Sequence, residues 1–130
     1  MQSRPDSART MGAGMARYKW LVFSNCSPGQ DDAFNTWYDD VHLPDLLRIP
    51  GVVGACRCGL AKPQLAVMET GMEPCDAEKI GARFRYLAIY EFDTHDPASV
   101  IEEIRARANT PLMELSPHLG EVYTVLYEDR

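Results

Sequence analysis

Strand-like and helix-like segments alternate in this chain in an order that few folds share. Four segments are rich in aromatic and β-branched residues, as strands are, and two repeat apolar residues at helical spacing. The strand-like segments are 18–25, 52–60, 86–92 and 121–128, and the helix-like segments are 30–42 and 97–109. The predicted order is therefore β-α-β-β-α-β.

This order is typical of an α+β, ferredoxin-like unit with an antiparallel sheet, in which both helices cover one sheet face. The other face is also predicted to be apolar, because both strand registers carry large residues: Trp20 and Val22 alternate with Leu21 and Phe23. A sheet that is apolar on both faces needs a second cover, and a second copy of the chain is the simplest one. We therefore predict a homodimer joined through the sheet faces.

The chain has the length of one domain, 130 residues. Residues 1–16 lack aromatic and β-branched bulk, which predicts a disordered tail before a single domain over 17–130. Pro44 and the Ile49-Pro50-Gly51 turn are expected to interrupt the chain after the first helix. The segment 61–85 has no clean period and carries two prolines and two glycines, so we expect a long loop that could cover a cleft.

Charge and cysteine content narrow the class of protein. The chain has 13 basic and 19 acidic residues, a net charge of −6, which disfavours nucleic acid and anionic membrane surfaces as partners. No apolar run approaches the ~20 residues that span a bilayer, and none marks a signal peptide. We expect a cytoplasmic protein whose four cysteines are free thiols. The three histidines are dispersed, and Cys56 and Cys58 lack common zinc spacing, so no metal site is predicted.

The densest group of chemically capable residues lies in the first helix. At ~100° per residue, Asn35, Tyr38 and His42 form one polar edge beside the apolar stripe. Histidine moves protons near neutral pH, tyrosine can hold an oxygen, and asparagine can bind a carbonyl or hydroxyl. The alternative is that His42 complements the helix dipole and Tyr38 packs in the core.

Two strand residues extend this candidate site. Arg57 lies in the middle of a strand, so a covered guanidinium needs an anion; an acidic substrate group and an ion pair with Glu91 are both open. Tyr90 shares a strand face with Tyr86 and either lines a pocket or packs.

The segments WYDDVHLPDLLRIPGVVGACR and RYLAIYEFDTHDPASVIEEIRAR resemble the dimeric α+β barrel superfamily, in particular its EthD-like branch and uncharacterised bacterial relatives. The resemblance covers residues 18–128 and implies ferredoxin-like units whose sheets join in a dimeric barrel. The histidine of the family pattern W-Y-x-x-x-H-x-P-D falls on His42. The superfamily includes cofactor-independent oxygenases, cyclases, dehydratases, decarboxylases and isomerases, so it implies a fold better than a reaction.

We therefore expect a small enzyme without metal or cofactor, of the lyase, isomerase or cofactor-free monooxygenase type, acting on an aromatic or polyketide-like hydrophobic molecule. Cyclisation, dehydration, decarboxylation, isomerisation and oxygenation all suit this hypothesis. The predicted catalytic residues are His42 and Tyr38, and the predicted substrate-binding residues are Asn35, Arg57 and Tyr90. The alternative is a non-catalytic binding or accessory protein. A third reading is a structural dimer whose cleft is plugged by Trp20, Tyr90 and Met113.

Overall fold

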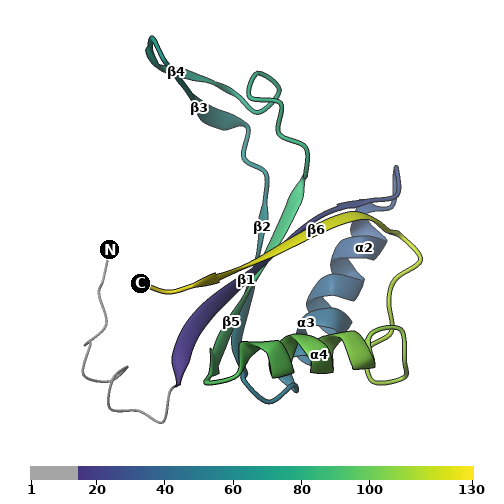
Figure 1. Cartoon of the computed structure of the whole chain (residues 1–130). Helices are drawn as coiled ribbons and strands as arrows, with labels where there is room; N and C mark the ends of the chain where they lie inside the picture. Colours follow the sequence, from purple (N-terminus) through teal and green to yellow (C-terminus); the bar gives the residue numbers. More distant parts are fainter. Residues whose placement is uncertain (1–14) are drawn as a thin grey trace.

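A computed structural model describes residues 15–130; residues 1–14 of the predicted tail lie outside the described residues. A continuous helical segment follows the first strand, and one further helix follows the strand β5 (Figure 1). The strands are β1 (Ala16–Cys26), β2 (Val52–Gly59), β3 (Pro63–Met68), β4 (Gly71–Asp76), β5 (Tyr86–Thr94) and β6 (Leu119–Glu128). The helical elements are α2 (Asp31–Trp37), the π-helix η1 (Tyr38–His42), α3 (Leu43–Leu47) and α4 (Pro97–Arg107).

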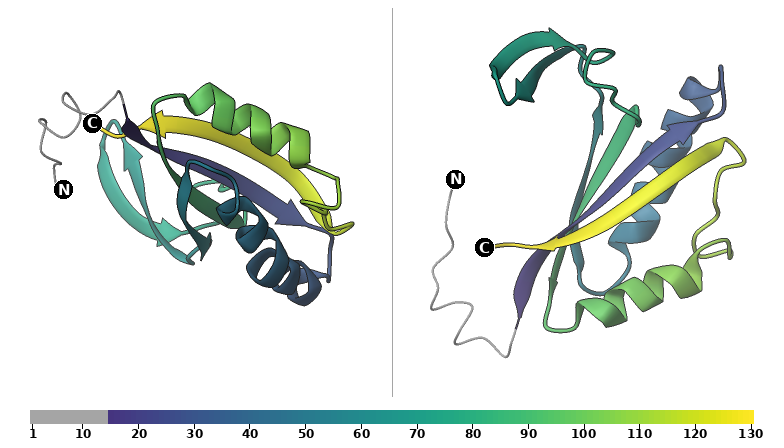
Figure 2. Two further views of the ribbon diagram at one scale, coloured as in Figure 1. Left: turned by 90° about the horizontal axis from the view of Figure 1, so that it is seen from below. Right: turned by 45° about the horizontal axis from the view of Figure 1, so that its top comes forward.

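Four strands form one antiparallel sheet in the order β2-β5-β1-β6. The helices lie together on one side of this sheet, which Figures 1 and 2 show from three directions. The prediction of an α+β fold with an antiparallel sheet and two helical segments is confirmed. The predicted dimeric barrel stays a prediction, since it concerns a second copy of the chain.

The core lies between the helices and one face of the sheet. Strand β5 alternates strictly: Ala88, Tyr90 and Phe92 are buried against the helices, while the residues between them are partly exposed. Phe34 from the first helical segment and Val100 from α4 pack into the same cluster. Because alternate residues of a strand face the same side of the sheet, one row of side chains on this central strand lies under both helices.

The opposite sheet face, which we call the open face, carries no helix. The strand registers assign to it Leu21, Phe23, Cys56, Cys58, Leu87, Ile89, Tyr123, Val125 and Tyr127. Tyr123 and Tyr127 are more than half exposed. The four cysteines, two of them on this face, are all free thiols. The same registers also place Arg17, Lys19, Glu91 and Asp93 on this face, at the end away from Phe23. The sequence prediction that both sheet faces are apolar therefore agrees with the structure for the part of the open face that lies between these charges and the β3–β4 hairpin.

The first helical segment was expected to end before Pro44, but it continues past this residue. It continues to Leu47 by way of the π-helix η1, in which the backbone N–H of Leu43 donates to the carbonyl of Tyr38. In a regular α-helix the ring of Pro44 would meet the carbonyl of Asp40, four residues earlier. The wider π-turn immediately before Pro44 is a known way to accommodate such a conflict, and it keeps His42 within a helix.

The segment 61–85 contains a β-hairpin and not only a loop. Strands β3 and β4 pair from Pro63 opposite Asp76 to Met68 opposite Gly71. Pro63 and Pro74 argue against strands in the sequence, but each strand of a two-stranded hairpin has a free edge where the missing N–H costs nothing. The hairpin stands clear of the helices (Figures 1 and 2).

Candidate functional site

An apolar cavity of about 140 Å³ lies between the sheet and the helices. We call it the His42 cavity, because His42 is its only imidazole. Its wall combines strands β1 and β6, the first helical segment, α4 and the connection that follows α4. Trp37 holds that connection in place, since its indole N–H donates to the carbonyl of Glu114 at 3.0 Å. Trp20 and Met113, two of the predicted plugs, line the cavity and narrow it without filling it.

His42 is held by two aromatic rings. Its imidazole stacks on Trp37, with ring centroids 4.5 Å apart, and meets the Tyr38 ring edge-on at 5.1 Å. Burial lowers the pKa of His42 to about 4; Asp45 opposes this shift and Arg57 reinforces it. The Nδ1 atom is buried and has no hydrogen-bond partner in the described chain. His42 is therefore a neutral imidazole near pH 7 with an unused ring nitrogen.

Tyr38 and Tyr90 are both phenols that burial keeps neutral. Burial raises the pKa of Tyr38, although the Tyr90 hydroxyl and, more weakly, the Arg57 charge act in the opposite direction. The pKa of Tyr90 is raised far more, again chiefly by burial. Tyr38 lines the His42 cavity, but Tyr90 lies deeper in the core, with its ring 5.4 Å from Trp20. The structure thus brings Tyr38 to the predicted site and places Tyr90 behind it.

Arg57 is a largely buried cation in an aromatic setting. Its guanidinium carbon lies 4.2 Å from the centre of the Tyr38 ring, and its side chain is 11% exposed. Nη1 donates to Asp39 at 3.1 Å, while Nε and Nη2 are buried without partners among the described residues. The ion pair with Glu91 that the sequence left open does not form, because Arg57 lies beside Ala88 on the helix-covered face, whereas Glu91 lies on the open face and pairs with Arg17.

Asn35 lies at a second, polar cavity of about 460 Å³, which Arg57 also lines. The Asn35 amide donates to the Tyr86 hydroxyl at 3.4 Å, and that hydroxyl in turn donates to Asp31. The Tyr86 hydroxyl, together with Arg85, lowers the pKa of the Asp31 carboxyl. Asn35 and His42 therefore line different cavities. The predicted single row of polar residues is divided, with Tyr38 contacting both His42 and Arg57.

Two acidic residues of this region escaped the sequence analysis. Asp39 is the partner of Arg57, and Asp31 is the partner of Arg85. The available signal was weak: two carboxylates eight positions apart in one helical segment, one arginine in β2 and one immediately before β5. Only the packing of the helix on β2 and β5 pairs them.

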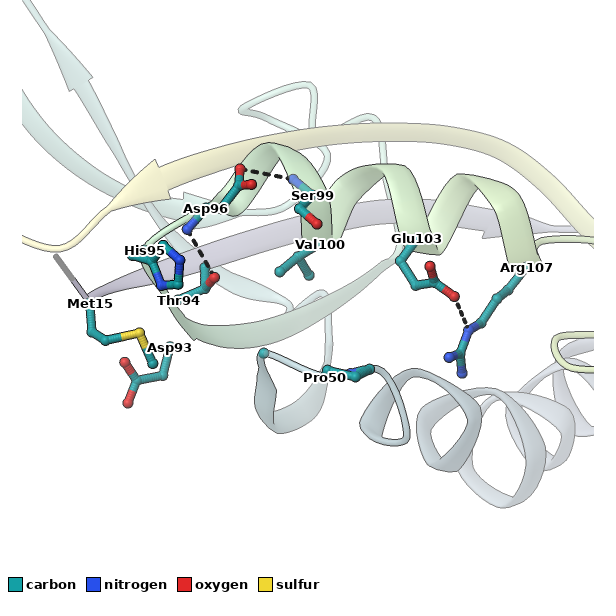
Figure 3. A pocket seen from close by; sticks show the side chains of 11 residues that line it. Met15, Pro50, Asp93, Thr94, His95, Asp96, Ser99, Val100, Glu103 and Arg107 are labelled. Carbon is teal, nitrogen blue, oxygen red and sulfur yellow. Dashed lines mark hydrogen bonds and ion pairs between the residues drawn. The ribbon is translucent and has the colours of Figure 1, made fainter. Parts of the chain in front are cut away.

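A third cavity, of about 480 Å³, lies at the start of α4 (Figure 3). Its polar groups serve the helix itself. Asp96 caps α4 by accepting from the backbone N–H of Ser99 at 3.2 Å, and Glu103 pairs with Arg107 at 2.7 Å. None of the predicted site residues lines this cavity, so the His42 cavity remains the candidate site.

Among known proteins, the chain has a distant likeness to a solved structure. No family model and no curated protein matches the chain. A crystal structure of an ethyl tert-butyl ether D (EthD) family protein from Bacillus halodurans is similar, with 17% sequence identity and a TM-score of 0.47. The alignment covers 89% of this chain and 100% of that one. No family is assigned to the chain on these comparisons.

Within residues 15–130, no three histidine, cysteine or acidic side chains gather closely enough to hold a metal ion. Over the same range, no helix has the length and apolar character needed to cross a membrane.

Proposed function

We propose that this chain is a small enzyme in which neutral His42 acts as a general base on a hydrophobic molecule with one ring. The observation that supports this proposal most strongly is the state of His42. It is a buried imidazole with an unpaired Nδ1, set in the wall of an apolar cavity. A buried polar atom without a partner costs free energy, which a hydrogen bond from a ligand would offset.

The direction of proton transfer follows from the pKa of His42. A value of about 4 leaves the imidazole unprotonated near pH 7, so it accepts a proton before it can return one. The substrate must therefore supply an acidic C–H or O–H bond.

The size of the cavity limits the substrate. About 140 Å³ is close to the ~150 Å³ of an engineered apolar cavity that binds benzene. One six-membered ring fits this space, whereas a polyketide with several fused rings does not. The aromatic part of the sequence-based hypothesis is therefore preferred over the polyketide-like part.

The chemistry we propose begins with a carbon acid beside a carbonyl group. His42 takes the proton, and the electron pair of the broken C–H bond moves to the carbonyl oxygen to form an enolate. The neutral phenol of Tyr38 donates a hydrogen bond to that oxygen, and the Arg57 charge behind the Tyr38 ring favours the anion. The imidazolium then returns the proton to another atom, which gives isomerisation. No step requires a cofactor.

The open face supports a second part of the proposal, a homodimer joined through the sheets. Strand spacing and rise give each sheet face an area of roughly 500 Å². Two such faces together bury roughly 1,000 Å², which is the lower limit for a specific interface. The exposed Tyr123 and Tyr127 are aromatic residues of the kind enriched at interfaces.

A second candidate function is binding without catalysis. It is favoured by the wall of the His42 cavity, where His42 and Tyr38 are the only residues with titratable side chains. A carrier of a small ring compound would need only this apolar space and one hydrogen bond.

Deuterium exchange separates the two candidates. The full chain is incubated in D2O with single-ring ketones (cyclohexanone, cyclohexenone and acetophenone), and deuterium incorporation next to the carbonyl is followed by NMR. For at least one ketone we expect exchange above the buffer rate, and we expect His42→Gln to slow it about 10²-fold or more. His95→Gln serves as the matched control, because His95 is an exposed histidine outside the cavity.

The contradicting result is equally concrete. If ketones bind with the same affinity to both variants and no exchange exceeds that of buffer, the chain is a binding protein. If His42→Gln exchanges as fast as the original chain, His42 is not the base.

A further inference from the structure

The β3–β4 hairpin carries an apolar side that the rest of the described chain does not cover. Four apolar residues lie next to one another on that side, with Leu65 opposite Pro74 and Val67 opposite Met72, and the pair Pro63 and Asp76 follows them at the base of the hairpin. Val67 is 71% exposed and Met72 69% exposed. We call these four residues the apolar side of the hairpin. Exposed apolar side chains scattered singly are ordinary, but four on one side of one hairpin form a patch.

Stability also argues that the hairpin has a partner. An isolated two-stranded hairpin is only marginally stable in water. It usually needs a third strand or another element packed against it. The hairpin projects from the end of the β2–β5 pair and stands clear of the helices (Figure 1). Its two strands pair with each other and with no strand of the main sheet.

The size of the predicted dimer interface indicates which partner this is. The two open faces alone bury roughly 1,000 Å², the lower limit for a specific complex. One side of a hairpin of this length offers roughly 200 Å². Each hairpin would also cover an equal area of the other copy. With both surfaces of both hairpin contacts counted, the total is roughly 1,800 Å², within the standard range for stable complexes.

The position of the hairpin in the chain fits the same partner. Strand β2 leads into β3, and β4 leads back to β5, so the hairpin begins where the edge strand β2 ends and the central strand β5 begins. An aromatic cluster lies at this end of the open face: Phe23 is 6.0 Å from both Phe84 and Tyr123, measured between ring centroids. A copy docked on the open face therefore lies within reach of the hairpin.

We propose that the β3–β4 hairpin is a dimerisation arm whose apolar side packs on a second copy of this chain. The inference rests on the homodimer proposed above and is independent of the chemistry at His42. Two-fold symmetry supplies both contacts at once, because each copy offers one arm and receives one.

Sedimentation equilibrium of the full chain tests the arm with a matched pair of substitutions. Met72→Glu places a charge on the apolar side, and Met68→Glu places the same charge on the other side of the same hairpin. We expect Met72→Glu to raise the dimer dissociation constant about tenfold or more. Met68→Glu should change it by about twofold at most. Both positions are exposed, so circular dichroism should report a native fold for each variant.

A third variant separates failure of the arm from failure of the dimer. Tyr127→Glu alters the open face at the end far from the hairpin and should weaken any sheet-to-sheet dimer. If it does so while Met72→Glu changes nothing, the arm proposal is overturned and the dimer stands. If the original chain is a monomer at every concentration, both are overturned, and the proposal for His42 is left untouched.

Discussion

The Tyr38 ring contacts both the His42 imidazole and the Arg57 guanidinium, and burial sets the charge state of Tyr38 and His42. Tyr38 and His42 are neutral because water cannot stabilise their ionised forms in this position. The Arg57 guanidinium donates to Asp39 and lies over the Tyr38 ring, 4.2 Å away. Tyr38, a neutral hydrogen-bond donor, thus contacts both a neutral base, His42, and a positive charge, Arg57.

The lowered pKa of His42 predicts a specific loss of stability in acid. The unfolded chain binds this proton near pH 6.5 and the folded chain only near pH 4, so unfolding becomes easier as the pH falls between these values. His42 should account for about 2–3 kcal/mol of the stability lost by pH 4. Urea unfolding at several pH values checks this, since His42→Gln should lose less stability on acidification than the original chain. Equal losses would show that His42 titrates normally.

The sequence analysis singled out His42, Tyr38 and Arg57, but it could not give all the contacts that these side chains make. Helical spacing correctly placed Tyr38 next to His42, because neighbours four apart on a helix meet. It could not find the Asp39–Arg57 pair, because that contact joins a helix to a strand 18 residues away. It also could not place Tyr90 in the core, since a strand pattern shows which side a residue faces and not how deeply it lies.

At the level of elements, the departures from the predicted pattern have local causes. The strands of the main sheet follow the residue pattern closely, because β-branched and aromatic runs have few alternatives. The first helical segment runs past Pro44 because a π-turn accommodates the proline, an adjustment that no spacing rule foresees. The hairpin was missed because its prolines mask a strand pattern and its apolar side is not buried in one copy of the chain.

The turn between α3 and β2 holds α4 in place, which makes Gly51 a sensitive position. Gly51 has φ of +96°, and a Cβ there would lie 2.8 Å from Val100 on α4. Gly51→Ala should therefore lower the free energy of unfolding by about 2–3 kcal/mol, from backbone strain and overpacking together.

Gly29→Ala separates these two costs, and urea unfolding measures both variants. Gly29 also has a positive φ, of +75°, but a Cβ there meets no atom within 4 Å. It should lose only about 1 kcal/mol, the cost of the backbone alone. Equal losses for the two variants would show that the contact with Val100 does not matter.

At the scale of the whole molecule, the two faces of the sheet have different surroundings. The helix-covered face holds the His42 cavity, and the open face and the hairpin carry the exposed apolar residues that we propose contact a second copy. Strand periodicity predicted this division, because residues of both registers were apolar. The contribution of the hairpin was not predictable, since only the structure shows that its apolar residues share one side.

The measurement that tests the proposed site most directly is an NMR spectrum of the imidazole nitrogens in 15N-histidine-labelled protein. The His42 signals are identified by their loss in His42→Gln. At pH about 5.5, between the two pKa values, these signals should be those of a neutral ring. Adding cyclohexenone should shift them. A protonated His42 at that pH, or signals that no single-ring ketone moves, would contradict a neutral base beside a ring-sized cavity.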